Sequence, residues 1–135
     1  MVDSPTARQV QRPLSPHLQI YRFTWTMAMS IVHRITGMAL YAGTILLVWW
    51  LAAAAAGPGP YETFRDVAGS WIGIVVLIGY TWALLHHALG GLKHLFQDFG
   101  HGFGRQARFA WAKGTLIASL VLTVAVWVAI FLVWS

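Results

Sequence analysis

Three long stretches without a formally charged residue constrain this chain more than any other feature of its sequence. They cover residues 35–56, 67–92 and 114–135, or 22, 26 and 22 residues. A helix needs about 20 residues to cross the roughly 30 Å hydrocarbon core of a bilayer. The chain has 135 residues, of which 58% are hydrophobic. We therefore expect an all-α integral membrane protein in which three transmembrane helices form an antiparallel bundle.

The predicted domain organisation follows from these stretches. Residues 1–24 are polar and contain prolines, which disfavour a helix, and we expect a cytoplasmic N-terminal segment there. The membrane domain then covers 25–135, with spans over about 25–56, 67–96 and 111–135. The sequence Gly57-Pro58-Gly59-Pro60 is expected to end the first helix and to begin a short outer loop that reaches Asp66.

The positive charges predict how the chain is oriented. A net charge of +5 in a soluble protein would suggest nucleic acid, but here eight of the nine Lys and Arg residues fall on one side of the predicted membrane. Only Arg65 falls on the other side. The positive-inside rule then places the N-terminus in the cytoplasm and the C-terminus across the membrane.

The second span carries a histidine cluster where a purely structural helix would be apolar. His87, Gly91 and His94 follow one another at i, i+4 and i+7 and share a stripe, while His86 is rotated about 100° from it. Gly90 and Gly91 allow a neighbouring helix or a flat ligand to approach closely, and the glycines alone do not distinguish these. Because the chain has no cysteine, a metal or haem iron would need histidine or a partner's side chain as its ligand.

A second polar group lies in the first span at a matching depth. Ser30, His33 and Arg34 share one helical face. Arg34 lies on the order of 13 Å below Trp25, and His87 roughly 15 Å below the same membrane surface. Arg34 could simply snorkel to the surface, but its polar neighbours favour a clamp for an anion or polar ligand. Span three carries no ionisable residue, and we interpret it as a packing helix.

Three motifs then suggest a family. They are residues 12–21, residues 30–37 (Ser-Ile-Val-His-Arg-Ile-Thr-Gly) and the pattern His87-x-x-x-Gly91-x-Lys93-His94-x-x-x-Asp98-Phe99-Gly100. In this order, and with three spans, the chain resembles the cytochrome b subunit, the large membrane anchor, of succinate dehydrogenase (respiratory complex II).

The resemblance implies a haem b- and ubiquinone-binding anchor in a bacterial inner membrane, with its C-terminus in the periplasm. Its implied partners are a second small membrane anchor, which completes the bundle, an iron–sulfur subunit and a flavoprotein subunit. Succinate oxidation, a step of the tricarboxylic acid cycle, would reside in the partners, so that no catalytic residue is expected in this chain.

The resemblance also implies roles for individual residues. His87 would be an axial ligand of the haem iron, with the other axial histidine coming from the partner anchor. The Gly91 spacing favours His87 over His86, which we expect to be a packing residue. The implied quinone-site residues are Ser30 and Arg34, the implied haem-propionate contacts are His33 and Arg34, and Asp98 and His94 match the motif with weaker roles.

Two other functions compete with this prediction. A haem-free fumarate reductase anchor would share the topology and the quinone chemistry, but His87 counts against it. A small transporter or assembly subunit could use His33, Arg34 and His87 to line a proton or anion path. Three spans without a visible inverted repeat count against that alternative.

Overall fold

The computed structural model describes residues 21–134, with side chains described to residue 133, and forms four helices within that range. They are α1 (Trp25–Ala56), α2 (Pro58–Gly69), α3 (Trp71–Asp98) and α4 (Arg105–Trp134). Three stretches are long and apolar enough to cross a membrane, namely Trp25–Ala56, Trp71–Asp98 and Arg105–Val133. The predicted all-α fold class with three spans is confirmed. The first family motif, residues 12–21, falls outside the described range except for Tyr21.

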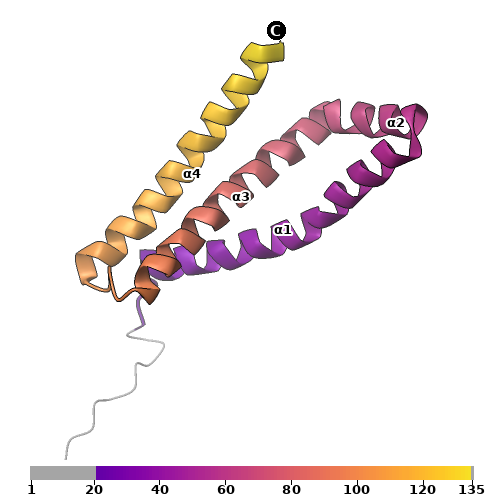
Figure 1. The fold of residues 1–135 in the computed structure, drawn as a ribbon. Coiled ribbons are helices and arrows are strands. Elements are labelled where there is room, and N and C mark those ends of the chain that lie inside the picture. Colours follow the sequence, from indigo (N-terminus) through magenta and orange to yellow (C-terminus); the bar gives the residue numbers. More distant parts are fainter. Residues whose placement is uncertain (1–20, 135) are drawn as a thin grey trace, which may run out of the picture.

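The three long helices meet at one end of the molecule and spread apart toward the other (Figure 1). Helix α3 is central and packs against both α1 and α4. The shared end contains the first turns of α1, the last turns of α3 and the first turns of α4 (Figure 1). Since Arg34, Lys93, Arg105 and Arg108 all belong to these segments, we call it the basic end.

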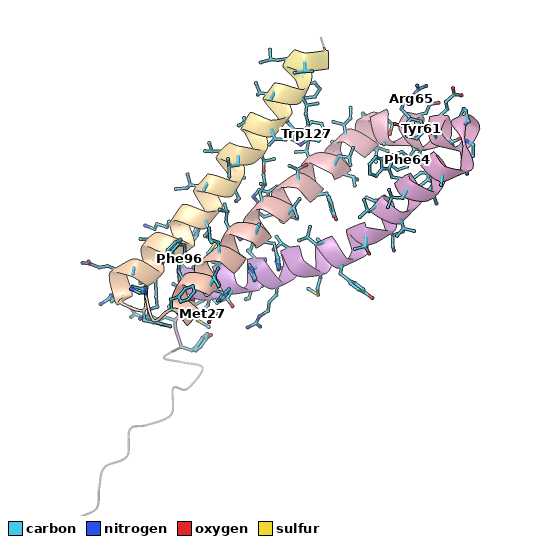
Figure 2. All side chains as sticks on the ribbon, in the orientation of Figure 1. Met27, Tyr61, Phe64, Arg65, Phe96 and Trp127 are labelled. Carbon is cyan, nitrogen blue, oxygen red and sulfur yellow. The ribbon has the colours of Figure 1, made fainter. Side chains whose placement is uncertain are left out.

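Small and polar side chains fill the interior, while large apolar side chains point outward (Figure 2). The buried apolar residues are Ala53, Ala83 and Ala112. By contrast, Tyr41 and Val133 are 82% and 81% exposed. A soluble protein buries its large apolar side chains, so this arrangement suits a chain whose outer surface meets lipid or partner helices.

Helix α2 corrects the loop that we expected between the first two spans. That prediction was wrong: the chain turns at Gly57 (φ 108°) and immediately forms a helix that begins at Pro58. Proline is well suited to the first helical position, because the N–H that it lacks would have no intrahelical partner there. Ser70 then caps α3, where its Oγ accepts a hydrogen bond from the Gly73 N–H at 3.1 Å.

A glycine-containing turn connects α3 to α4 at the basic end. The N–H groups of Gly100 and His101 donate to the carbonyls of Gln97 and Phe96, at 2.8 and 3.2 Å. Gly100 and Gly102 have φ values of 80° and 85°, which glycine adopts without steric cost. The turn reverses the chain within a few residues, and it thereby places α4 beside the histidine cluster of α3.

Candidate functional site

Two histidines join α1 to α3 near the basic end. The rings of His33 and His87 stack with their centroids 4.1 Å apart and their planes at 11°. Each ring also contacts the other residue's backbone: His87 Nδ1 lies 3.1 Å from the His33 carbonyl oxygen, and His33 Nε2 lies 3.3 Å from the His87 carbonyl oxygen. We call this reciprocal arrangement the histidine clip.

The clip fixes which nitrogen of each ring carries a proton. A carbonyl oxygen can only accept a hydrogen bond, so His87 Nδ1 and His33 Nε2 must be the donors. The His33 carbonyl accepts a second hydrogen bond from Thr36 Oγ1 at 2.9 Å. A neutral His87 therefore has its lone pair on Nε2, which makes no hydrogen bond to any residue in 21–133. Such a nitrogen can coordinate a metal.

Two glycines allow the clip to form. A Cβ atom on Gly37 of α1 would lie 2.9 Å from His87 Cε1, and a Cβ atom on Gly90 of α3 would collide with the His33 ring. Gly91, in contrast, faces open space. Of the glycine pair in span two, it is therefore Gly90 that allows the close approach of α1.

A polar pocket of about 230 Å³ adjoins the clip between α1, α3 and α4. Its α1 side contains Ser30, His33 and Arg34, the three residues predicted to share a face. The remaining polar side chains are His86, Lys93 and His94 from α3 and Thr115 from α4. The lining includes no carboxylate, and it differs from the apolar cavity of about 490 Å³ between α1, α2 and α3 at the other end. This pocket suits a ligand that accepts hydrogen bonds or carries negative charge.

His87 itself does not line this pocket, because His33 lies between them. His33 is thus the one residue of the clip that also belongs to the pocket lining. His94 also contacts the His33 ring, edge to face, with the centroids 5.5 Å apart. The structure therefore brings His33, His87 and His94 into one group and places Ser30 and Arg34 beside it.

His86 occupies a different environment from His87. It is 2% exposed, its ring lies 5.4 Å from the Trp82 ring, and its Nδ1 lies 3.2 Å from Ser119 Oγ on α4. Ser119 Oγ also lies 2.8 Å from the Leu116 carbonyl oxygen, and the Thr115 backbone is a further hydrogen-bonding neighbour of the His86 ring. His86 packs against α4 and contributes to the pocket wall.

The sequence analysis missed the polar stripe on α4. Thr115, Ser119 and Thr123 are 8%, 0% and 6% exposed, and they follow one another at intervals of four residues. This i, i+4, i+8 spacing was the available signal, but we interpreted span three as a packing helix from its overall hydropathy. Asp98 is exposed at the last position of α3 and does not line the pocket.

Three helices long and apolar enough to cross a membrane, with a polar pocket and a histidine pair between them, define a multi-pass membrane protein. Residues 8–130 match the family model described as the succinate dehydrogenase/fumarate reductase transmembrane subunit. The chain belongs to this family, whose succinate dehydrogenase members are subunits of an oxidoreductase complex.

Individual relatives agree with the family match. The chain is 43% identical over 120 residues to the succinate dehydrogenase cytochrome b556 subunit of Paracoccus denitrificans, covering 89% of this chain and 92% of the relative. It is 34% identical to the subunit of that name from Rickettsia felis, over 87% of this chain and 92% of the relative. The human mitochondrial cytochrome b560 subunit is 38% identical over 96 residues, covering 67% of this chain and 55% of the relative.

Proposed function

We propose that this chain is the haem b- and ubiquinone-binding anchor subunit of a succinate:ubiquinone oxidoreductase in a bacterial inner membrane. It would pair with a second small membrane anchor and dock an iron–sulfur subunit and a flavoprotein subunit at its basic end. Electrons from the iron–sulfur subunit would then reach quinone beside α1 and α3. The names of the relatives, which describe cytochromes b of succinate dehydrogenase, support this proposal.

The observation that carries the proposal is the histidine clip. A histidine that coordinates a metal commonly donates its other ring N–H to a carbonyl, which fixes the ring's orientation. His87 has this arrangement, because its Nδ1 faces the His33 carbonyl at 3.1 Å and its Nε2 has no protein partner within 21–133. The residues present therefore fit a haem group whose iron His87 would hold, together with a histidine that the partner anchor would supply. A bound haem supplies a one-electron redox centre.

The pocket beside the clip suits a quinone headgroup. A quinone has two carbonyl oxygens that accept hydrogen bonds, and the Ser30 hydroxyl and the Arg34 guanidinium are donors in the lining. Arg34 and His33 would also be available to a haem propionate. His94 completes the group of rings, while Asp98 is assigned to the site only because it matches the motif. Reduction of quinone to quinol takes up two electrons and two protons, which would enter from the basic end.

A reduced-minus-oxidised optical spectrum of the purified complex tests the haem assignment. We expect a b-type signal that disappears in His87→Ala and survives in His86→Ala, since the buried His86 ring contacts Ser119 on α4. Loss of the signal in His86→Ala alone would reverse the assignment. A complex that reduces quinone without any haem signal would favour a haem-free anchor.

Two further variants test the quinone site. Ser30→Ala and Arg34→Ala should lower quinone reduction while leaving the oxidation of succinate by an artificial soluble acceptor largely intact. Ile31→Ala is a suitable control, because Ile31 neighbours Ser30 but does not line the pocket. Equal loss of both activities would show that the variants disturb assembly and not the quinone site.

A further inference from the structure

A second polar cavity lies at the basic end, beside the pocket proposed for quinone. It has a volume of about 130 Å³, and its polar lining consists of Thr26 from α1, Lys93 and Gln97 from α3, and Arg108 from α4. It adjoins the larger pocket, with which it shares Met29, Lys93 and Ala112. It has room for several water molecules, or for a group of similar size.

The charges around this cavity are all positive. Lys93 and Arg108 approach it from two different helices, and no carboxylate lines it. The one ion pair within residues 21–133 is Arg65–Asp66. It belongs to α2, at the opposite end of the molecule from Lys93 and Arg108 (Figure 1). An anion bound in this cavity would have two positive charges, from two helices, as its neighbours. The Thr26 hydroxyl and the Gln97 amide add neutral hydrogen-bond donors.

The depth of the cavity points to the lipid headgroup region. Lys93 is five residues before the end of α3 at Asp98, and Arg108 is three residues after the start of α4. At about 1.5 Å per residue, both lie on the order of 5–8 Å from the ends of their helices. Exposed aromatic side chains, including Trp25 and Phe96, lie near the same end, as is typical of a membrane interface. Figure 2 labels Phe96 there.

We propose that this cavity binds the phosphate group of an anionic phospholipid, with Lys93 and Arg108 as its charge partners. Basic pockets between transmembrane helices on the cytoplasmic side are suited to anionic headgroups. The acyl chains would extend along the exposed apolar faces of α1 and α4. Inorganic phosphate offers the same charged oxygens but lacks the acyl chains. Binding of inorganic phosphate can therefore be distinguished from binding of a phospholipid. The inference requires neither haem nor quinone.

The test measures phospholipid that remains bound to the purified, detergent-washed complex after exposure to phosphatidylglycerol or phosphatidylcholine, counted by native mass spectrometry. We expect the wild-type complex to retain phosphatidylglycerol selectively. The double variant Lys93→Gln/Arg108→Gln should retain less phosphatidylglycerol than the wild type, by about tenfold or more, because each cation near the membrane surface contributes to the binding of anionic lipid. Lys93→Arg, which keeps the charge, should retain the lipid.

A matched control separates the cavity from general surface charge. Arg105→Gln/Lys113→Gln removes the same two charges from exposed positions of α4 that do not line the cavity, and it should retain phosphatidylglycerol like the wild type. Equal loss in both double variants would overturn the proposal. If the cavity double variant fails to assemble, Lys93→Gln and Arg108→Gln are measured singly, and wild-type retention in both would also overturn it.

Two additional outcomes would identify a different occupant. Excess inorganic phosphate that binds as well as phosphatidylglycerol and displaces it would indicate a free-phosphate site. Unchanged lipid retention together with loss of the iron–sulfur subunit would indicate an acidic protein surface. Either result would overturn the lipid assignment without affecting the haem spectrum or quinone reduction by the wild-type complex.

Discussion

His86 Nδ1 on α3 lies within hydrogen-bonding distance of Ser119 Oγ on α4, at 3.2 Å, and both residues are almost completely buried. This side-chain hydrogen bond therefore joins α3 to α4, while the histidine clip joins α3 to α1. The central helix is held on both sides by adjacent histidines.

Ser119→Ala should destabilise the α3–α4 pair. The substitution removes the Ser119 hydroxyl from the buried His86 ring, and the loss of this interhelical hydrogen bond costs about 1 kcal/mol or somewhat more. Thr123→Val is the matched control, since Thr123 Oγ1 donates only to the Ser119 carbonyl within its own helix, at 2.7 Å. Unfolding of the complex in a detergent mixture of increasing denaturing strength measures both. An equal effect of the two variants would contradict a specific role for the interhelical bond.

Gly90→Ala should weaken the contact between α1 and α3. The added methyl group would meet the His33 ring, and overpacking of this kind typically costs about 1–3 kcal/mol. Gly91→Ala adds the same methyl group one residue later, where this chain leaves open space. We expect the thermal midpoint of the purified complex to fall for Gly90→Ala only. A larger fall for Gly91→Ala would indicate that a partner helix packs against that face.

Gly37→Ala should displace the His87 ring, although residue 87 itself remains a histidine. Its Cβ would lie 2.9 Å from His87 Cε1, closer than carbon atoms normally approach. If His87 ligates haem, we expect a lower haem content or a shifted absorption band. Gly79→Ala on α3 is the control, because a Cβ there meets nothing in this chain. Pyridine haemochrome analysis per mole of assembled complex gives the content, and an unchanged value and spectrum for Gly37→Ala would count against the proposed ligand.

Gly57→Ala should destabilise the turn between α1 and α2. Gly57 has φ 108° and ψ −172°, a conformation that is essentially restricted to glycine and costs other residues about 1–3 kcal/mol. Gly69→Ala, at the helical end of α2, has neither a positive φ nor a close neighbour and should change the thermal midpoint little. If the two variants melt alike, Gly57 does not need its unusual backbone conformation.

Hydropathy was sufficient to predict the three spans, because about 20 apolar residues have few structural alternatives. It was not sufficient for α2. We read Gly57 and the prolines that follow as the start of a loop, whereas Gly57 makes the turn and Pro58 begins a helix. The error arose because proline both ends helices and favours their first position, and the sequence alone does not say which applies.

The candidate site was predictable within each helix and less so between helices. Helical spacing correctly grouped Ser30, His33 and Arg34, which line one pocket. The separation of His87 from that pocket by the His33 ring depends on how α1 and α3 are rotated relative to each other. Periodicity within one helix carries no information about that rotation. Ser119 was missed for a related reason, since its importance depends on its facing His86.

The reciprocal form of the histidine clip limits how α1 and α3 can move. Each residue's ring nitrogen reaches the other's backbone carbonyl, so sliding one helix past the other by a single residue, about 1.5 Å, would break both bonds at once. The two helices are therefore held in one register at this level. His33 lines the pocket and stacks on His87, so a displacement of the His33 ring from the pocket side would press directly on the His87 ring.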